Sequence, residues 1–218
     1  MPESIFEISP SSHRSLQDLI ELPDVNVRAS EPLVMADGAV PPVSLQTHVR
    51  GLWSPSSLFI LFSGRFLQLR MFLEDFPWDK AGKTLHLWEK SDVYEFMIGR
   101  ECQRTRRYKE FQVAPDGRWF SADIRLERDH VITDREWNGV IRCISVVNGV
   151  EKVWKAAIEI PWAILGGREG EGKWRCNLYR ATGKFHGDEL LAWQPTGYGE
   201  NCFHRPHLFG TMKILEDA

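Results

Sequence analysis

The chain has 218 residues, of which 43% are hydrophobic and 26% are charged, and its formal net charge is -3. This composition is typical of one globular domain and excludes a disordered chain. The lack of net positive charge gives no electrostatic support for a nucleic-acid partner.

The N-terminal segment from Met1 to Asp18 contains no long apolar run, so it does not have the pattern of a signal peptide. No stretch of the sequence is apolar over the length that a membrane-spanning helix needs, so we expect no membrane partner. We therefore expect a cytoplasmic protein, or a secreted one whose signal peptide has been removed. The four cysteines form no C-x-x-C pair, which argues against a structural zinc site.

Two parts are expected along the chain. Residues 1–30 form an N-terminal arm or extension with a short helix at 15–22, and residues 31–218 form one β domain. From residue 43 onwards, short apolar or alternating runs separated by turn residues predict strands. Their predicted ranges are 43–50, 57–63, 66–73, 84–90, 92–99, 108–114, 118–127, 139–147, 151–160, 174–181, 189–193 and 208–215. Many short strands of this kind predict an all-β fold, an antiparallel β-sandwich of the jelly-roll type.

Three turn signals divide these strands. Pro115-Asp116-Gly117 predicts a tight hairpin turn, and Asn148-Gly149 predicts a two-residue type I′ turn. Residues 161–165, which begin with Pro161 and are followed by two glycines, predict a single helical turn that ends at Gly166.

Alternation along each strand separates two faces, because successive side chains point to opposite sides. The first, apolar face is expected to build one core between two sheets. It consists of Leu85 and Leu87 in 84–90, Tyr94, Phe96 and Ile98, Phe111 and Val113, Phe120, Ala122, Ile124 and Leu126, Trp154, Ala156, Ile158 and Ile160, and Trp174, Cys176 and Leu178.

The second face mixes aromatic side chains with carboxylates and amides, and few lysines or arginines lie among them. It contains Trp88, Glu95, Tyr108, Glu110, Gln112, Asn177 and Tyr179. Aromatic rings cover the apolar C–H face of a sugar, while carboxylate and amide groups bind its hydroxyls. The pattern therefore indicates a sugar-binding surface, with simple cover of the sheet as the alternative.

The order of these motifs resembles the family 9 carbohydrate-binding modules over about residues 43 to 215. The resemblance lies in segments 88–96, 108–117, 154–162, 177–180, 193–195 and 203–210. It implies a noncatalytic module that binds a mono- or oligosaccharide on a concave face between two aromatic rings. The implied ligand-binding residues are Trp88, Glu95, Glu110, Gln112, Asn177, Tyr179, Arg180, Glu200, Phe203 and His204.

Four of these positions depart from the family pattern. Phe203 replaces the second Trp of the clamp, and Gln112 stands where an Arg is common. Tyr179 replaces an amide, and Glu200 replaces an Asn. Arg180 is expected to hold Glu95 in place or to contact the ligand. The resemblance also allows a structural calcium ion, with Asp75, Asp79 and Asp92 as candidate ligands.

Two further functions stay open at this stage. Glu95 and Glu110 on one face are the pair of carboxylates that a glycoside hydrolase needs. His86 and Met97 are the kinds of residue that ligate haem in redox domains of similar fold.

Overall fold

The computed structural model describes residues 4–12, 15–21, 32–71, 83–128, 130–182 and 189–216. Its strands are β1 (Ile5–Pro10), β2 (Val34–Met35), β3 (Thr47–Trp53), β4 (Ser57–Arg65), β5 (Val93–Arg100), β6 (Arg107–Val113), β7 (Trp119–Glu127), β8 (His130–Asp134), β9 (Arg142–Asn148), β10 (Val153–Pro161), β11 (Trp174–Ala181), β12 (Leu190–Ala192) and β13 (Gly210–Ile214). The helical segments are short: α1 (Leu16–Glu21), α2 (Leu87–Lys90), α3 (Cys102–Thr105) and the 3₁₀ turns η1 (Val43–Leu45), η2 (Trp162–Leu165) and η3 (Pro206–Leu208). None of the described helices has the length and apolar character needed to cross a membrane.

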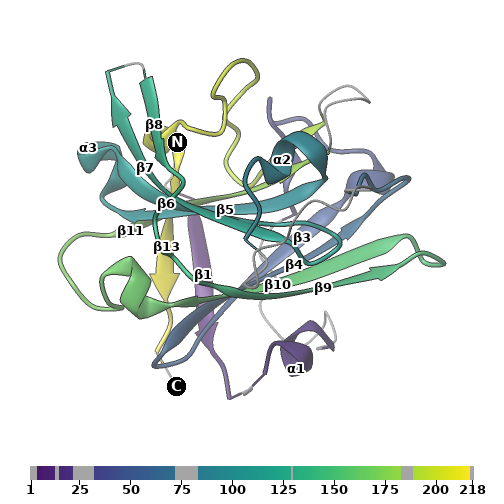
Figure 1. Ribbon diagram of the computed structural model, residues 1–218, viewed down its shortest axis with the longest axis horizontal. Helices are drawn as coiled ribbons and strands as arrows, with labels where there is room; N and C mark the ends of the chain where they lie inside the picture. Colours follow the sequence, from purple (N-terminus) through teal and green to yellow (C-terminus); the bar gives the residue numbers. More distant parts are fainter. Residues whose placement is uncertain are drawn as a thin grey trace.

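The strands form a sandwich made from one continuous sheet that folds over on itself. Hydrogen bonding runs in the order β8-β7-β6-β5-β11-β13-β1-β3-β4-β10-β9. Figure 1 shows β7, β6, β5 and β11 in an upper layer, and β3, β4, β10 and β9 in a lower layer. The predicted all-β sandwich is confirmed.

The sheet is mixed rather than purely antiparallel, because β1 runs parallel to both β13 and β3. Residues 5–10, which the sequence pattern assigns to an arm, therefore form a central strand instead. A Cβ on Gly51 of β3 would lie 2.2 Å from the Ile8 side chain of β1, so only glycine lets these strands pack this closely. The short helix expected at 15–22 is present as α1, which packs on the outer face of β10.

The core between the layers is built from the apolar faces predicted for four strands. Tyr94 and Phe96 of β5, Phe111 of β6, Trp154 of β10 and Leu178 of β11 all belong to it. The alternation of these strands therefore predicts their inner faces correctly.

The prediction for β7 is wrong, because its apolar face points outwards. The β6–β7 register sets Phe120 opposite Gln112 and Ala122 opposite Glu110. Residues directly opposite in a sheet share a face, so Phe120 and Ala122 lie on the outer face with those polar groups. Trp119, on the other side of β7, packs in the core. The inner face of β7 carries the polar Ser121 and Asp123 beside Trp119, while the apolar Phe120, Ala122 and Ile124 pack in a separate cluster on the outer face. The more apolar side of this alternating strand is therefore not the side that faces the lower layer.

Two predicted strands and one predicted turn are also corrected. Residues 84–90 end in the short helix α2 rather than continuing as a strand, and residues 66–71 contain no strand. The β9–β10 connection is a four-residue loop in which the Asn148 side chain accepts hydrogen bonds from two backbone N–H groups. The hairpin at Gly117 and the 3₁₀ turn that ends at Gly166 are present as predicted.

Candidate functional site

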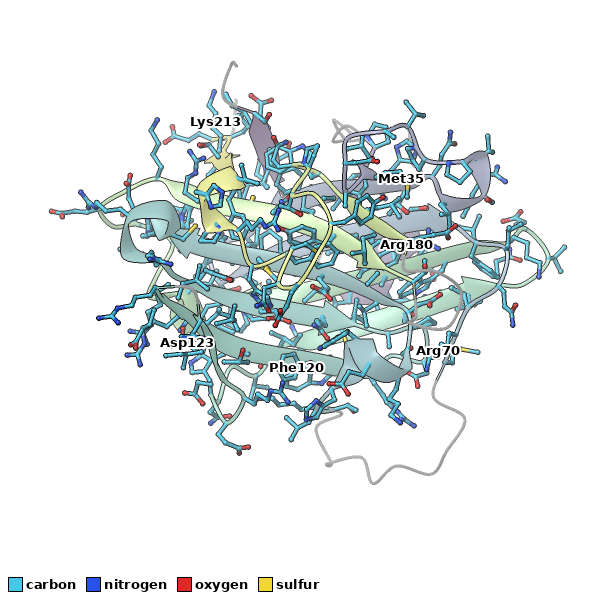
Figure 2. All side chains as sticks on the ribbon, turned by 90° about the horizontal axis from the view of Figure 1, so that it is seen from above. Met35, Arg70, Phe120, Asp123, Arg180 and Lys213 are labelled. Carbon is cyan, nitrogen blue, oxygen red and sulfur yellow. The ribbon has the colours of Figure 1, made fainter. Side chains whose placement is uncertain are left out.

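The outer face of the upper layer carries a second apolar cluster, separate from the core. This cluster joins β5, β6, β7 and β11 to Leu87 of α2 and to Phe203 and Phe209 of the segment that precedes β13. Figure 2 looks down on this face, and the C-terminal segment drawn in yellow crosses in front of the upper strands. The outer face is therefore partly covered by α2 and by this segment.

A pocket of about 540 Å³ opens where this cover is incomplete. It is lined by Trp88, Glu95, Glu110, Gln112, Ala181, Thr182, Leu190, Gly199, Glu200, Asn201, Cys202, Phe203 and His204. The structure thus brings together seven of the ten predicted site residues: Trp88, Glu95, Glu110, Gln112, Glu200, Phe203 and His204.

The floor of the pocket is a row of three buried polar side chains on β5 and β6. Gln112 Nε2 donates to Glu110 Oε1 at 2.6 Å and to Glu95 Oε1 at 3.2 Å. Because both oxygens lie within hydrogen-bond distance of one nitrogen, the two carboxylates are close neighbours. The β5–β6 register places Glu95 opposite Gln112, which explains why the three side chains meet.

Burial makes both carboxyl groups hold their protons more tightly than in water. It raises the pKa of Glu110 to about 7, and the hydrogen bond from Gln112 and the charge of Arg135 limit that rise. Burial also raises the pKa of Glu95 well above its usual value, and the neighbouring Glu110 adds to this effect. The pair therefore retains a proton near neutral pH, where isolated glutamates are fully ionised.

Aromatic side chains form part of the pocket wall. Trp88 lies in α2 and is 41% exposed, so its indole ring is available to a ligand. Phe203 is only 8% exposed and stacks on Tyr179, with ring centroids 4.0 Å apart. Of the two predicted clamp rings, Trp88 is the one with a large open surface.

Asn177 and Tyr179 do not line the pocket but hold its wall in place. The Tyr179 hydroxyl donates to the Phe203 carbonyl at 2.9 Å and accepts from Asn177 Nδ2 at 2.8 Å. Asn177 Oδ1 accepts from the Gln194 backbone N–H. These bonds fasten the segment that carries Phe203 to β11.

His204 is half-buried at the edge of the pocket. Its Nδ1 lies 2.8 Å from the Tyr108 hydroxyl, and burial lowers the pKa of the imidazole to about 4. His204 is therefore neutral at physiological pH and adds no positive charge to the pocket.

The role predicted for Arg180 is wrong. Its neighbour Tyr179 faces the outer side of β11, so Arg180 points into the sandwich. The guanidinium is fully buried and donates to the carbonyls of Leu45 and Arg65, at 3.2 and 2.7 Å, and to the Thr47 hydroxyl. Arg180 thus ties β11 to the lower layer and contacts neither Glu95 nor the pocket.

Six lining residues were not predicted: Ala181, Thr182, Leu190, Gly199, Asn201 and Cys202. Asn201 and Cys202 could have been inferred, because they lie between the predicted Glu200 and Phe203. Thr182 and Leu190 carry no chemical signal, and only the pairing of β11 with β12 brings them to the pocket.

The residues named for metal and haem binding are not gathered in this pocket. Asp75 and Asp79 lie outside the described residues, and Asp92 is buried just before β5. Neither His86 nor Met97 lines the pocket. His86 Nδ1 lies 2.6 Å from a Glu89 carboxylate oxygen, and Met97 is buried in the outer cluster.

Comparison with known proteins identifies the fold. No protein-family model and no curated protein sequence matches the chain. Among solved structures, the chain is similar to a protein from Bacteroides uniformis ATCC 8492 that is proposed to bind carbohydrate. The TM-score is 0.73 at 18% identity, and the match covers 98% of this chain and 100% of that one.

The chain is also similar to a family 9 carbohydrate-binding module from Caldicellulosiruptor kristjanssonii, solved with glucose and with cellotriose. The glucose complex matches with a TM-score of 0.63 at 12% identity, and covers 99% of this chain and 97% of that one. The cellotriose complex matches with a TM-score of 0.61 at 10% identity, and covers 99% and 95%. The chain therefore has the fold of the family 9 carbohydrate-binding modules.

Proposed function

We propose that this protein is a noncatalytic carbohydrate-binding protein that takes a mono- or oligosaccharide into the pocket on the outer face of the upper layer. The observation that carries this proposal is the exposed Trp88 ring beside a floor made of Glu95, Gln112 and Glu110. A ring for the C–H face of a sugar and polar groups for its hydroxyls are then present in one pocket of suitable size.

The fold comparison supports the same proposal, since the module from Caldicellulosiruptor kristjanssonii was solved with glucose and with cellotriose. We assign ligand contact to Trp88, Glu95, Glu110, Gln112, Glu200, Phe203 and His204. Asn177 and Tyr179 act as positioning residues, because they fasten the segment that carries Phe203.

Titration with glucose and cellotriose tests the proposal, with tryptophan fluorescence and calorimetry as readouts. We expect saturable binding, and we expect Trp88→Ala to weaken it about fivefold or more, because stacking on an aromatic ring contributes about 1 kcal/mol or more. Leu85→Ala is the matched control, since Leu85 is similarly exposed in the same segment but does not line the pocket.

Absence of binding across a broad panel of sugars would overturn the proposal. Turnover of aryl glycosides that is lost in Glu95→Gln would instead show that the protein is a glycoside hydrolase. A Soret band that appears with haemin and is lost in His86→Ala would establish the haem-binding domain.

A further inference from the structure

The pocket is acidic, and its described lining contains no lysine or arginine. Three carboxylates, those of Glu95, Glu110 and Glu200, line it. His204 is neutral at physiological pH, as argued above. Arg135 is a cation whose charge acts on Glu110 but whose side chain is not part of the lining. Within the described lining, a bound ligand therefore meets carboxylates and no cationic side chain.

The floor also contains a hydrogen-bond acceptor that has no donor in the described part of the chain. Gln112 is 1% exposed and lines the pocket, and among the described residues its Oε1 has no hydrogen-bond partner. A buried amide oxygen left without a donor costs free energy, so a group that donates to it is favoured. The floor thus holds the carboxylates of Glu95 and Glu110 close together, beside an amide oxygen that lacks a donor within the described structure.

We infer, resting on the proposed sugar-binding function, that this pocket selects an amino sugar whose amine is protonated over the neutral sugar of the same size. An ammonium group carries three donors and one positive charge, which suit a lining that contains the carboxylates of Glu95, Glu110 and Glu200. The exposed ring of Trp88 also attracts a cation held over its face.

The proton held by the carboxylate pair makes the preference for a charged sugar measurable, because binding of such a sugar should release that proton. In the free protein, burial keeps the pKa values of Glu95 and Glu110 raised, and repulsion from Glu110 raises that of Glu95 further. A bound ammonium replaces that proton as the source of positive charge, so the pair ionises and a proton is released to the buffer. A neutral sugar brings no such charge and leaves the proton in place.

Few other titratable groups face this pair from the surrounding elements. β7 contributes the apolar Phe120 and Ala122, and β11 contributes the Tyr179 hydroxyl, whose pKa burial raises well above its usual value. The C-terminal segment contributes Glu200, Cys202 and His204, and Arg135 acts from the turn after β8. Proton release on binding near pH 7 is therefore assigned to Glu95 and Glu110.

Calorimetry at pH 7 in two buffers of different ionisation enthalpy tests the inference with glucosamine, glucose and N-acetylglucosamine. We expect the affinity for glucosamine to exceed that for glucose by about tenfold or more. Binding of glucosamine should also release a measurable amount of protons. N-acetylglucosamine, which carries an uncharged amide at the same position, is expected to release no proton.

Two variants test which carboxylate is responsible for the preference for glucosamine and for the proton release. Glu110→Gln should bring the ratio of glucosamine to glucose affinity close to one and abolish proton release. Glu89→Gln is the matched control, because Glu89 lies next to Trp88 but does not line the pocket, and it should keep the preference. If Glu110→Gln does not fold, the proton release measured with the unaltered protein decides the question.

Equal affinity for glucose and glucosamine, without proton release, would overturn this inference and leave the proposed sugar binding intact. Failure of every sugar to bind would overturn both.

Discussion

The two faces of the upper layer use the same strands for different purposes. On the inner face, Tyr94 stacks between Phe62 and Trp154, with ring centroids 4.7 and 3.7 Å apart. On the outer face, Glu95 and Gln112 lie beneath an open pocket. The inner face is covered by a second layer of strands, whereas the outer face is covered only by α2 and the segment before β13. Dense cover produces a core, and incomplete cover leaves room for a ligand.

The largest expected difference between the two faces is in the loss of stability when a tryptophan is replaced by alanine. Trp154→Ala removes a fully buried side chain from the core and should lower the free energy of unfolding by about 3–5 kcal/mol. Trp88→Ala, the same change on the exposed side, should lower it by less than about 1 kcal/mol. Urea unfolding of both variants measures these two free energies of unfolding. Equal decreases would contradict the assignment of the core to the inner face and the open pocket to the outer face.

A smaller effect is expected at Arg180, a charged residue on the apolar side. Arg180→Met removes the hydrogen bonds to the carbonyls of Leu45 and Arg65 and should lower the free energy of unfolding by about 2–3 kcal/mol. Because Arg180 faces away from the pocket, the affinity for sugar should be unchanged under conditions where the variant is folded. A selective loss of affinity without loss of stability would place Arg180 in the site after all.

The smallest effect is a pH dependence that belongs to the outer face. Burial raises the pKa of Glu110 from 4.5 to about 7 in the folded protein, so the folded state binds its proton more tightly than the unfolded state. This contribution to stability is complete below pH 4.5 and is lost as the pH rises through about 7. The free energy of unfolding should fall by on the order of 1–2 kcal/mol over this range because of the pair.

Glu110→Gln should flatten that part of the stability profile, as measured by denaturant unfolding at a series of pH values. Glu216→Gln, at an exposed carboxylate, is the control that should leave the profile unchanged. A profile that keeps its full slope in Glu110→Gln would show that the dependence arises elsewhere.

Local sequence determines the β-sandwich class and most of the polar floor. Alternation on β5 and β6 sets Glu95, Glu110 and Gln112 against the apolar core residues, because side chains on a strand point alternately to its two sides. The same rule already separates Arg180 from Tyr179, which are neighbours in sequence and cannot share a face. The turn residues Gly117 and Gly166 also act locally, through backbone conformations with positive φ that glycine adopts without strain.

Tertiary structure alone decides which face is covered and by what. Phe120 faces outwards because the β6–β7 register sets it opposite Gln112, and β1 lies within the sheet because distant strands pair with it. Trp88 reaches the pocket from a short helix, and Phe203 reaches it from a segment fastened by Tyr179. Alternation is a property of neighbouring residues, whereas register and cover depend on segments far apart in the chain. The residues of the polar floor can therefore be predicted from local alternation. The pocket above them forms only when α2 and the segment before β13 pack against the sheet.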